Sequence, residues 1–242
     1  MAIQSIQHVL AYAAVPALAI AAGGIAASIR APSAATSSAV QHFSAGVVFA
    51  AVATELLPDV VHRQLPMATI AGFALGVAAM LAIKAFAKGN EGPTPSATDL
   101  PTALLAALGI DIALDGLLIG IGVTAGERQG LLLTVALTLE VLLLGVSAAV
   151  ALTRSGRSRT TNVVVTAMFG AVLLVSSAIG AAVLGRASAT TVDLVLSFGV
   201  AALLYLVTEE LLVEAHEVPE TPLLSSLFFV GFLALLATEM LL

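Results

Sequence analysis

Three carboxylates stand inside apolar stretches of this sequence, where they could bind a cation. Asp111 and Asp115 lie near the middle of the apolar run at 100–125 and are four residues apart, so in a helix they share one face. Glu140 lies near the middle of the run at 129–153. The short turn at 126–130 makes these runs antiparallel neighbours. At ~1.5 Å of rise per residue, all three carboxylates reach one depth, and we expect them to face a common point.

The ligand chemistry of such a site is limited to oxygen and imidazole, because the sequence has no cysteine. Carboxylates suit Mg²⁺, Mn²⁺, Ca²⁺ and Fe²⁺, and Zn²⁺ also accepts them. Each ionised carboxylate in a membrane costs on the order of 3 kcal/mol, which a cation or protons must compensate. Crowded acids keep a proton when empty, so metal binding competes with protons. The alternative is that these acids hydrogen-bond to Thr124, Thr134 and Thr138 and only hold helices together.

The composition indicates that lipid surrounds most of the chain. Of the 242 residues, 60% are hydrophobic and 10% are charged, and the mean hydropathy is +1.09. The net charge of −6 and the lack of a long basic run argue against a nucleic-acid partner. A membrane helix needs about 20 apolar residues. We predict a single all-α transmembrane domain of eight spans at 8–30, 37–61, 67–87, 100–125, 129–153, 161–186, 190–214 and 222–242.

The orientation of the spans follows from the positions of Lys and Arg on the two sides of the membrane. One side holds six of these residues: Arg30, Lys84, Lys88, Arg154, Arg157 and Arg159. The other side holds three: Arg63, Arg128 and Arg186. The richer side is expected to be cytoplasmic, which places both termini outside. We expect a multi-pass protein of the cell membrane, specifically a bacterial inner membrane.

Further acids mark the two mouths of a path through the bundle. The outer ends of the second and eighth spans carry an expected outer vestibule of Glu55, Asp59 and Glu239. The inner third of the seventh span and its cytoplasmic mouth carry an expected exit of Glu209, Glu210, Glu214, His216 and Glu217. Taken singly, each can also be an ordinary interfacial charge. His8 and His42 lack a carboxylate at ligand spacing, and we interpret them as helix-end residues.

Several motifs in order give the chain a resemblance to the ZIP family of zinc and iron transporters. Glu55-Leu-Leu-Pro-Asp59 is similar to the family's His-Leu-Leu-Pro-Glu in the second helix. Asp111-Ile-Ala-Leu-Asp115-Gly is similar to His-Asn-x-Pro-Glu-Gly in the fourth, and Glu140 takes the first ligand position of the fifth. The run from Glu209 to Glu214 is similar to His-Glu-x-x-Pro-Glu in the seventh helix, and the run from Gly231 to Glu239 to the eighth, with its terminal acid.

This resemblance implies an eight-helix bundle with both termini outside, often a homodimer. It also implies metal flow into the cytoplasm by an elevator-like motion of helices one, four, five and six against the rest. Ile112, Val141 and Leu144 replace ligands of the family's second metal, so we expect one ion on Asp111, Asp115 and Glu140. Since carboxylates replace every matched histidine, manganese and ferrous iron are candidate substrates beside zinc. No organic cofactor is expected.

Two other functions compete with metal transport. A proton-linked carrier of an organic solute would use the same acids as a proton relay. A non-transporting homologue would act as a metal sensor or a structural partner. We do not expect an enzyme, because the spans contain no nucleophile beside a base.

Overall fold

The computed structural model describes residues 2–30, 32–89, 102–184, 187–219 and 221–241, and in these ranges the chain is helical without a strand. The predicted all-α class is therefore confirmed. The helices are α1 (Ala2–Ile29), α2 (Ala34–Ala51), η1 (Val52–Leu56), α3 (Leu57–Arg63), α4 (Pro66–Gly89), α5 (Thr102–Ala125), α6 (Glu127–Arg154), α7 (Arg159–Leu184), α8 (Ala189–Leu206), η2 (Val207–Leu211), α9 (Leu212–Ala215) and α10 (Pro222–Leu241). The two η segments are π-helical turns.

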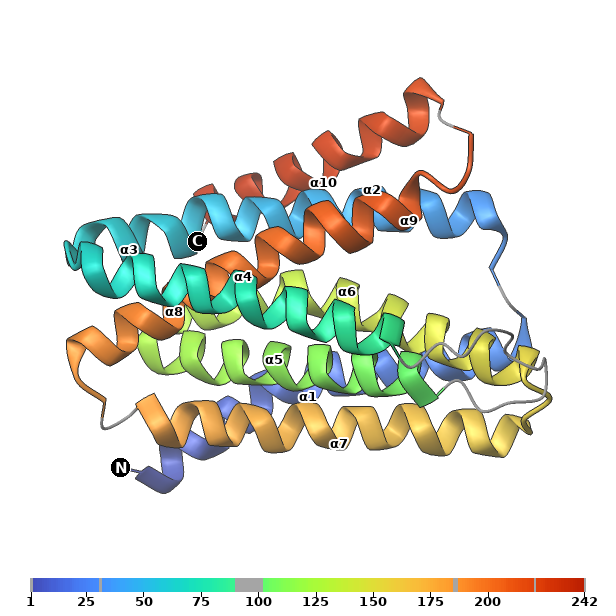
Figure 1. Cartoon of the computed structure of the whole chain (residues 1–242), viewed down its shortest axis with the longest axis horizontal. Helices are drawn as coiled ribbons and strands as arrows, with labels where there is room; N and C mark the ends of the chain where they lie inside the picture. Colours follow the sequence, from blue (N-terminus) through green and yellow to red (C-terminus); the bar gives the residue numbers. More distant parts are fainter. Residues whose placement is uncertain (1, 31, 90–101, 185–186, 220, 242) are drawn as a thin grey trace.

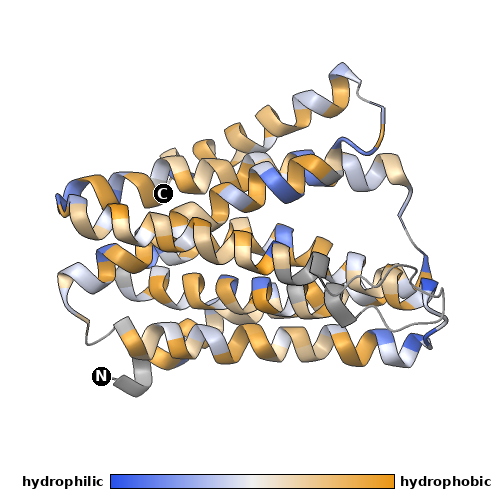
Figure 2. Cartoon of the chain, viewed as in Figure 1, coloured by the Kyte–Doolittle hydropathy of each residue, from blue (hydrophilic) through white to orange (hydrophobic). Residues whose placement is uncertain are grey.

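The described residues form a multi-pass membrane protein. Seven segments are long and apolar enough to cross a bilayer: 6–29, 34–63, 66–85, 127–154, 159–183, 189–211 and 222–241. Large apolar side chains on the surface fit this environment, since Met67 is 79% exposed and Leu18 is 71% exposed. Figure 2 shows hydrophobic residues along most of the helix surfaces. The predicted fourth span corresponds to α5, which is 24 residues long but is not one of these seven segments.

The helices fall into two blocks that lie one above the other in Figure 1. Block 1 contains α1, α5, α6 and α7, and each of these helices contacts the other members of the block. Block 2 has two central helices, α2 and α8. The peripheral helix α10 packs on α2, and the peripheral helix α4 packs on α8. We call the end of the bundle near the α5–α6 turn the Arg128 end, and the opposite end, where α6 ends, the Arg154 end.

Close backbone contacts hold block 1 together. A Cβ atom on Gly145 of α6 would lie 2.2 Å from the Ile20 carbonyl oxygen of α1. A Cβ atom on Gly120 of α5 would lie 2.0 Å from the Ser177 carbonyl oxygen of α7. These helices therefore approach more closely than any larger side chain allows, which is how helices associate in lipid without a hydrophobic driving force.

A buried polar side chain also joins the helices of block 1 near the Arg154 end. The side chain of Asn162 in α7 is 1% exposed. Its amide nitrogen donates to Ser28 Oγ of α1 at 3.2 Å and to Thr153 Oγ1 of α6 at 2.8 Å. Three helices of the block thus share one hydrogen-bonding side chain, which fixes their relative heights.

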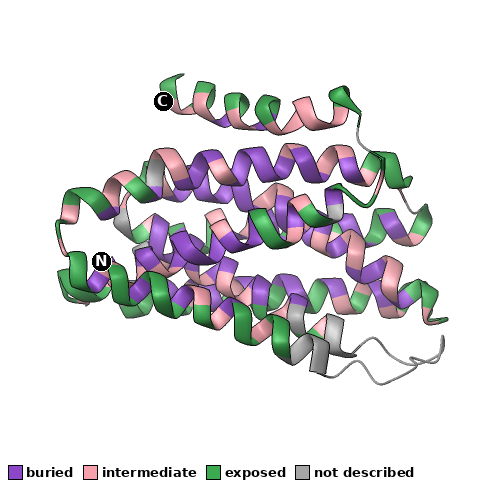
Figure 3. Cartoon of the chain, turned by 45° about the horizontal axis from the view of Figure 1, so that its top comes forward, coloured by how far each residue is buried: buried purple, intermediate pink, exposed green. Residues whose placement is uncertain are grey.

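Block 2 is built in the same way around its two central helices. A Cβ atom on Gly46 of α2 would lie 1.9 Å from the Phe228 carbonyl oxygen of α10, and one on Gly72 of α4 would lie 2.1 Å from the Leu194 carbonyl oxygen of α8. Only 11% of the α10 span is buried, against 61% of the span that contains α8. Figure 3 shows this contrast between α10 and the central helices.

The two central helices of block 2 have matching local features. Each begins at a serine whose hydroxyl accepts from a backbone N–H three residues later: Ser33 from Thr36 at 3.1 Å, and Ser188 from Thr191 at 3.2 Å. Each then passes into a π-helical turn that contains a Thr-Glu pair, at Val52–Leu56 and at Val207–Leu211. Such turns in α-helices often occur at functional sites, because the extra residue redirects the side chains that follow.

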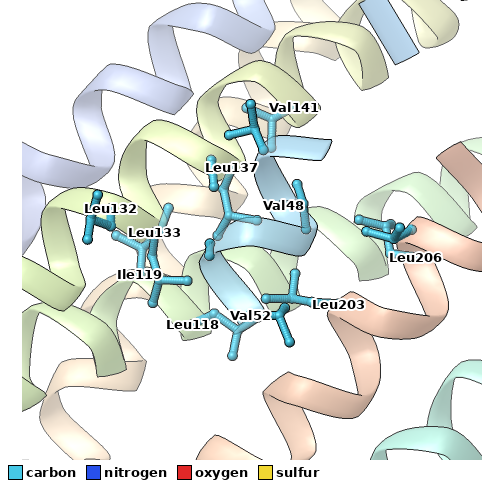
Figure 4. Packing of buried hydrophobic residues seen from close by; sticks show 14 of the residues in the cluster. Val48, Val52, Leu118, Ile119, Leu132, Leu133, Leu137, Val141, Leu203 and Leu206 are labelled. Carbon is cyan, nitrogen blue, oxygen red and sulfur yellow. The ribbon is translucent and has the colours of Figure 1, made fainter. Parts of the chain in front are cut away.

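The boundary between the blocks is lined by aliphatic side chains. Figure 4 shows Val48 and Val52 of block 2 between Leu137 of block 1 and Leu203 of block 2. Across this boundary, a Cβ atom on Gly199 would meet the side chain of Leu118, 2.4 Å away, rather than backbone. The blocks therefore meet through flexible side chains, whereas their own helices interlock at the backbone.

Candidate metal centre

The structure brings the three midspan carboxylates together. Asp111 and Asp115 come from α5 and Glu140 comes from α6, and one ligand oxygen from each lies within 4.8 Å of the others. They are 8%, 2% and 0% exposed, respectively. Glu140 stands about 20 Å from either end of α6, since 13 or 14 residues separate it from Glu127 and Arg154. The sequence prediction that these three acids face one point is confirmed.

Glycines set the directions in which these carboxylates point. Gly116 follows Asp115, and a Cβ atom there would lie 2.4 Å from the Leu173 carbonyl oxygen, so this face of α5 lies directly on α7. A Cβ atom on Gly130 would lie 2.7 Å from Val123 Cα, which brings the start of α6 against the end of α5. With these faces occupied, Asp115 is left to point toward Glu140 across the α5–α6 contact.

The carboxylate oxygens lack protein partners. Asp111 Oδ2, Asp115 Oδ2 and both side-chain oxygens of Glu140 are buried without a hydrogen-bond partner among the described residues. The ion pairs formed within this part of the chain include none of the three. Buried oxygens of this kind are costly unless a ligand or protons satisfy them.

The alternative of hydrogen-bonded glue does not match the contacts of the three threonines. Thr138 donates to the Thr134 carbonyl oxygen, and Thr124 donates to carbonyl oxygens of its own helix. The Thr134 hydroxyl is buried without a partner in the described structure. Among the described residues, none of the three threonines hydrogen-bonds to a carboxylate of the cluster.

A fourth acid approaches the cluster from the other block. Glu210 lies in η2 and is partly buried. It is not part of the group within 4.8 Å, but its charge adds to the negative potential at Asp111, Asp115 and Glu140. The predicted exit residue Glu210 thus acts on the cluster from block 2 at longer range.

A polar cavity opens at the Arg154 end between α2 and α6. Its volume is about 400 Å³, and its lining includes Ser37, Gln41, Ser147, Arg154 and Glu217. Ser147 lies seven residues after Glu140 on the same face of α6, a separation of about 10 Å. The lining of the cavity therefore comes within about 10 Å of Glu140 along α6, while the Glu140 side chain itself is 0% exposed. It contains the predicted exit residue Glu217.

The Arg128 end is closed over the same helix. Arg128 Nη2 lies 3.5 Å from Glu239 Oε1 and donates to the Glu239 carbonyl oxygen at 2.7 Å. Below this contact, Leu133 and Leu137 of α6 are 1% and 0% exposed. The predicted outer residue Glu239 thus joins α10 of block 2 to α6 of block 1, and aliphatic side chains separate it from Glu140.

The other predicted path residues have varied surroundings. Asp59 forms an ion pair of 3.1 Å with Arg63, and Glu209 forms one of 2.8 Å with Lys84. His216 follows α9 and lies against His42. The side chains of Glu55 and Glu214 lie outside those that the structure describes.

Two buried polar residues do not follow the sequence interpretation. Asp193 in α8 is 0% exposed, and Thr69 donates to its Oδ2 at 2.9 Å, although the sequence did not single it out. Its position inside an apolar run is the same signal that marked Glu140. His42 was interpreted as a helix-end residue, but it lies within α2 and is 2% exposed.

Comparison with known proteins adds no relative to this picture. No family model matches the sequence, and a search of curated proteins finds no match.

Proposed function

We propose that this protein transports a divalent metal cation across the membrane, with Asp111, Asp115 and Glu140 as the binding site. The observation that carries the proposal is the cluster itself: three buried carboxylates within 4.8 Å, with Asp111 Oδ2, Asp115 Oδ2 and both Glu140 oxygens buried without a hydrogen-bond partner among the described residues. A divalent ion supplies the positive charge that the surrounding side chains do not. One ion leaves one negative charge, so the loaded site retains a proton or one uncompensated charge.

In this proposal α5 also crosses the membrane, as the fourth span along the chain, which brings the number of spans to eight. It carries two of the ligands and is as long as α4. Both termini then lie outside and the Arg154 end faces the cytoplasm, in agreement with the greater number of Lys and Arg on that side. The ion moves toward the cytoplasm, because the polar cavity opens at that end. These features agree with the resemblance to the ZIP family.

The two blocks supply a means of alternating access. Block 1 holds the ligands, its helices interlock at glycines, and it meets block 2 through aliphatic side chains. Sliding along such a boundary breaks few polar contacts, whereas separating helices within a block breaks many close ones. In the conformation described here, the Arg128–Glu239 contact closes one side while the cavity opens on the other. We therefore take this conformation as the one that faces the cytoplasm, with Glu140 still buried away from the cavity.

The substrate is expected among Zn²⁺, Mn²⁺ and Fe²⁺, because carboxylate oxygens accept all three ions and the resemblance to the ZIP family favours them over Mg²⁺ and Ca²⁺. The test is uptake into proteoliposomes with each ion in parallel, for the wild type and an Asp111→Ala/Asp115→Ala variant. Glu127→Gln serves as the matched control, since it removes an exposed charge from α6 without touching the cluster. Uptake of one ion that only the double variant loses supports the proposal.

Two outcomes refute it. Uptake that persists in the double variant removes the carboxylates from the path. If folded wild-type protein takes up none of the ions, metal transport is refuted. A proton flux driven by an organic solute would then indicate a proton-linked carrier, and its absence would indicate a sensor.

A further inference from the structure

A second group of metal-ligating side chains lies in block 2, near the Arg154 end. His42 of α2 and His216, which follows α9, have ring centroids 5.2 Å apart, with the ring planes tilted by 60°. The hydroxyl of Ser38, one turn before His42, donates to the Ala215 carbonyl oxygen at 2.7 Å. This buried hydrogen bond fixes the two helices at the point where the imidazoles meet.

The Nδ1 atom of each ring contacts a backbone carbonyl oxygen of the preceding helical turn. His42 Nδ1 contacts the Ser38 carbonyl oxygen at 2.9 Å, and His216 Nδ1 contacts the Leu212 carbonyl oxygen. An Nδ1–H that donates to a carbonyl oxygen fixes the tautomer in which Nε2 carries the lone pair. This is the usual second-shell arrangement of a metal-binding histidine.

The buried ring of His42 points to a missing ligand. His42 is 2% exposed, and its Nε2 atom has no hydrogen-bond partner among the described residues. Leaving a polar nitrogen buried and unsatisfied costs about 1–3 kcal/mol, so a ring without a further role would gain by turning toward water or a backbone group. The neighbouring imidazole of His216 is exposed and gives an ion access to the pair.

The pair lies near the polar cavity along the chain. Gln41 and Glu217, which line that cavity, are the sequence neighbours of His42 and His216, although neither histidine lines it. The two histidines therefore belong to the same end of the bundle as the cavity.

We infer that His42 and His216 together bind a transition-metal ion through their Nε2 atoms, with water completing the coordination. Imidazole favours ions such as Zn²⁺, Ni²⁺ and Cu²⁺ over Mg²⁺ and Ca²⁺, so this site differs in selectivity from the carboxylate cluster. The position of this site on a transport path rests on the proposed function, whereas its ability to bind a metal ion does not. A path that passes from oxygen ligands to nitrogen ligands would retain borderline-soft ions at its cytoplasmic mouth.

The experiment uses Cu²⁺ as the probe, at one equivalent, on tag-free protein in detergent. The background is His8→Gln/His62→Gln, which removes the two remaining histidines. His62 must be removed because its Nδ1 atom contacts the Pro58 carbonyl oxygen at 2.7 Å in the same way and its exposed side chain could bind copper. Electron paramagnetic resonance reports how many nitrogen nuclei couple to the copper.

The expected result is coupling to two nitrogens, which falls to one or none in His42→Gln and also in His216→Gln. Since His216 is exposed, its replacement changes the signal without disturbing the packing that His42 takes part in. Asp111→Asn/Asp115→Asn should leave the two-nitrogen signal unchanged. An absent two-nitrogen signal, or one that survives both histidine substitutions, overturns the inference. Neither result bears on uptake, so the transport proposal fails or stands on its own assay.

Discussion

Replacing Asp115 by Asn distinguishes a metal site from a packing contact by the sign of the stability change. The side chain is 2% exposed and has two carboxylates within 4.8 Å. At that distance and an effective dielectric constant of about 20, two unit charges repel by about 3.5 kcal/mol. Asparagine keeps the size of the side chain and removes two of the three repulsions. Protons held by the empty cluster already relieve part of this energy, so we expect a gain of about 1–3 kcal/mol.

The same substitution should remove stabilisation by metal. An ion at about 100 times its dissociation constant stabilises the wild type by about 2.7 kcal/mol. For a chain of this size, that corresponds to a rise of roughly 5–10 °C in Tm. Asp115→Asn should therefore melt a few degrees higher than the wild type without metal, and should show almost no shift when metal is added.

The assay is thermal unfolding in detergent, followed by circular dichroism, with and without the ion that the uptake experiment identifies. Glu127→Gln, an exposed substitution on α6, should keep both the wild-type Tm and the full metal shift. A lower Tm for metal-free Asp115→Asn together with an unchanged metal shift would refute the reasoning, because the carboxylate would then contribute packing or hydrogen bonds and no ligand.

Three other predictions test the blocks and the gate. Gly145→Ala should prevent accumulation of folded protein, because its Cβ atom would lie 2.2 Å from the Ile20 carbonyl oxygen. Gly109→Ala should fold normally, because the nearest contact of its Cβ atom is a side-chain atom at 3.4 Å. Size-exclusion profiles of the two variants test this difference. Leu132→Cys introduces the only cysteine of the chain, at a buried position of α6. Adding Arg128→Gln to this variant should speed the labelling of that cysteine by an impermeant thiol reagent applied from the Arg128 end. An unchanged labelling rate would show that the ion pair does not close that side. Metal affinity should rise with pH, because ligating carboxylates must be deprotonated. Metal binding should therefore also release protons into a weak buffer. A dissociation constant that does not change with pH would contradict this prediction.

The arrangement of the blocks gives the Arg128–Glu239 pair a defined role in these tests. It joins α6 of the block that carries the ligands to α10 of the other block. Arg128 is half exposed, so the pair itself contributes little to stability. Its effect is expected on the balance between conformations, where a small energy difference changes populations.

The sequence alone was enough to predict an all-α membrane protein and the three carboxylates of the candidate site. Membrane character is a sum over the composition, and it does not depend on which helix contacts which. The cluster was predictable because its three acids are connected by local geometry: a spacing of four residues on one helix and a short turn to the next. No comparable local rule connects Glu210 to the electrostatics of the cluster, since it comes from a helix in the other block.

The tertiary structure decided which polar residues became buried partners. Asp193 meets Thr69 across 124 positions, and Ser38 meets Ala215 across 177. The same long-range packing turned His42 from an isolated residue into the neighbour of His216 and placed the cavity between α2 and α6. Helix periodicity fixes only the face on which a side chain stands. What that face meets depends on close backbone contacts between distant helices, which glycines permit but do not specify.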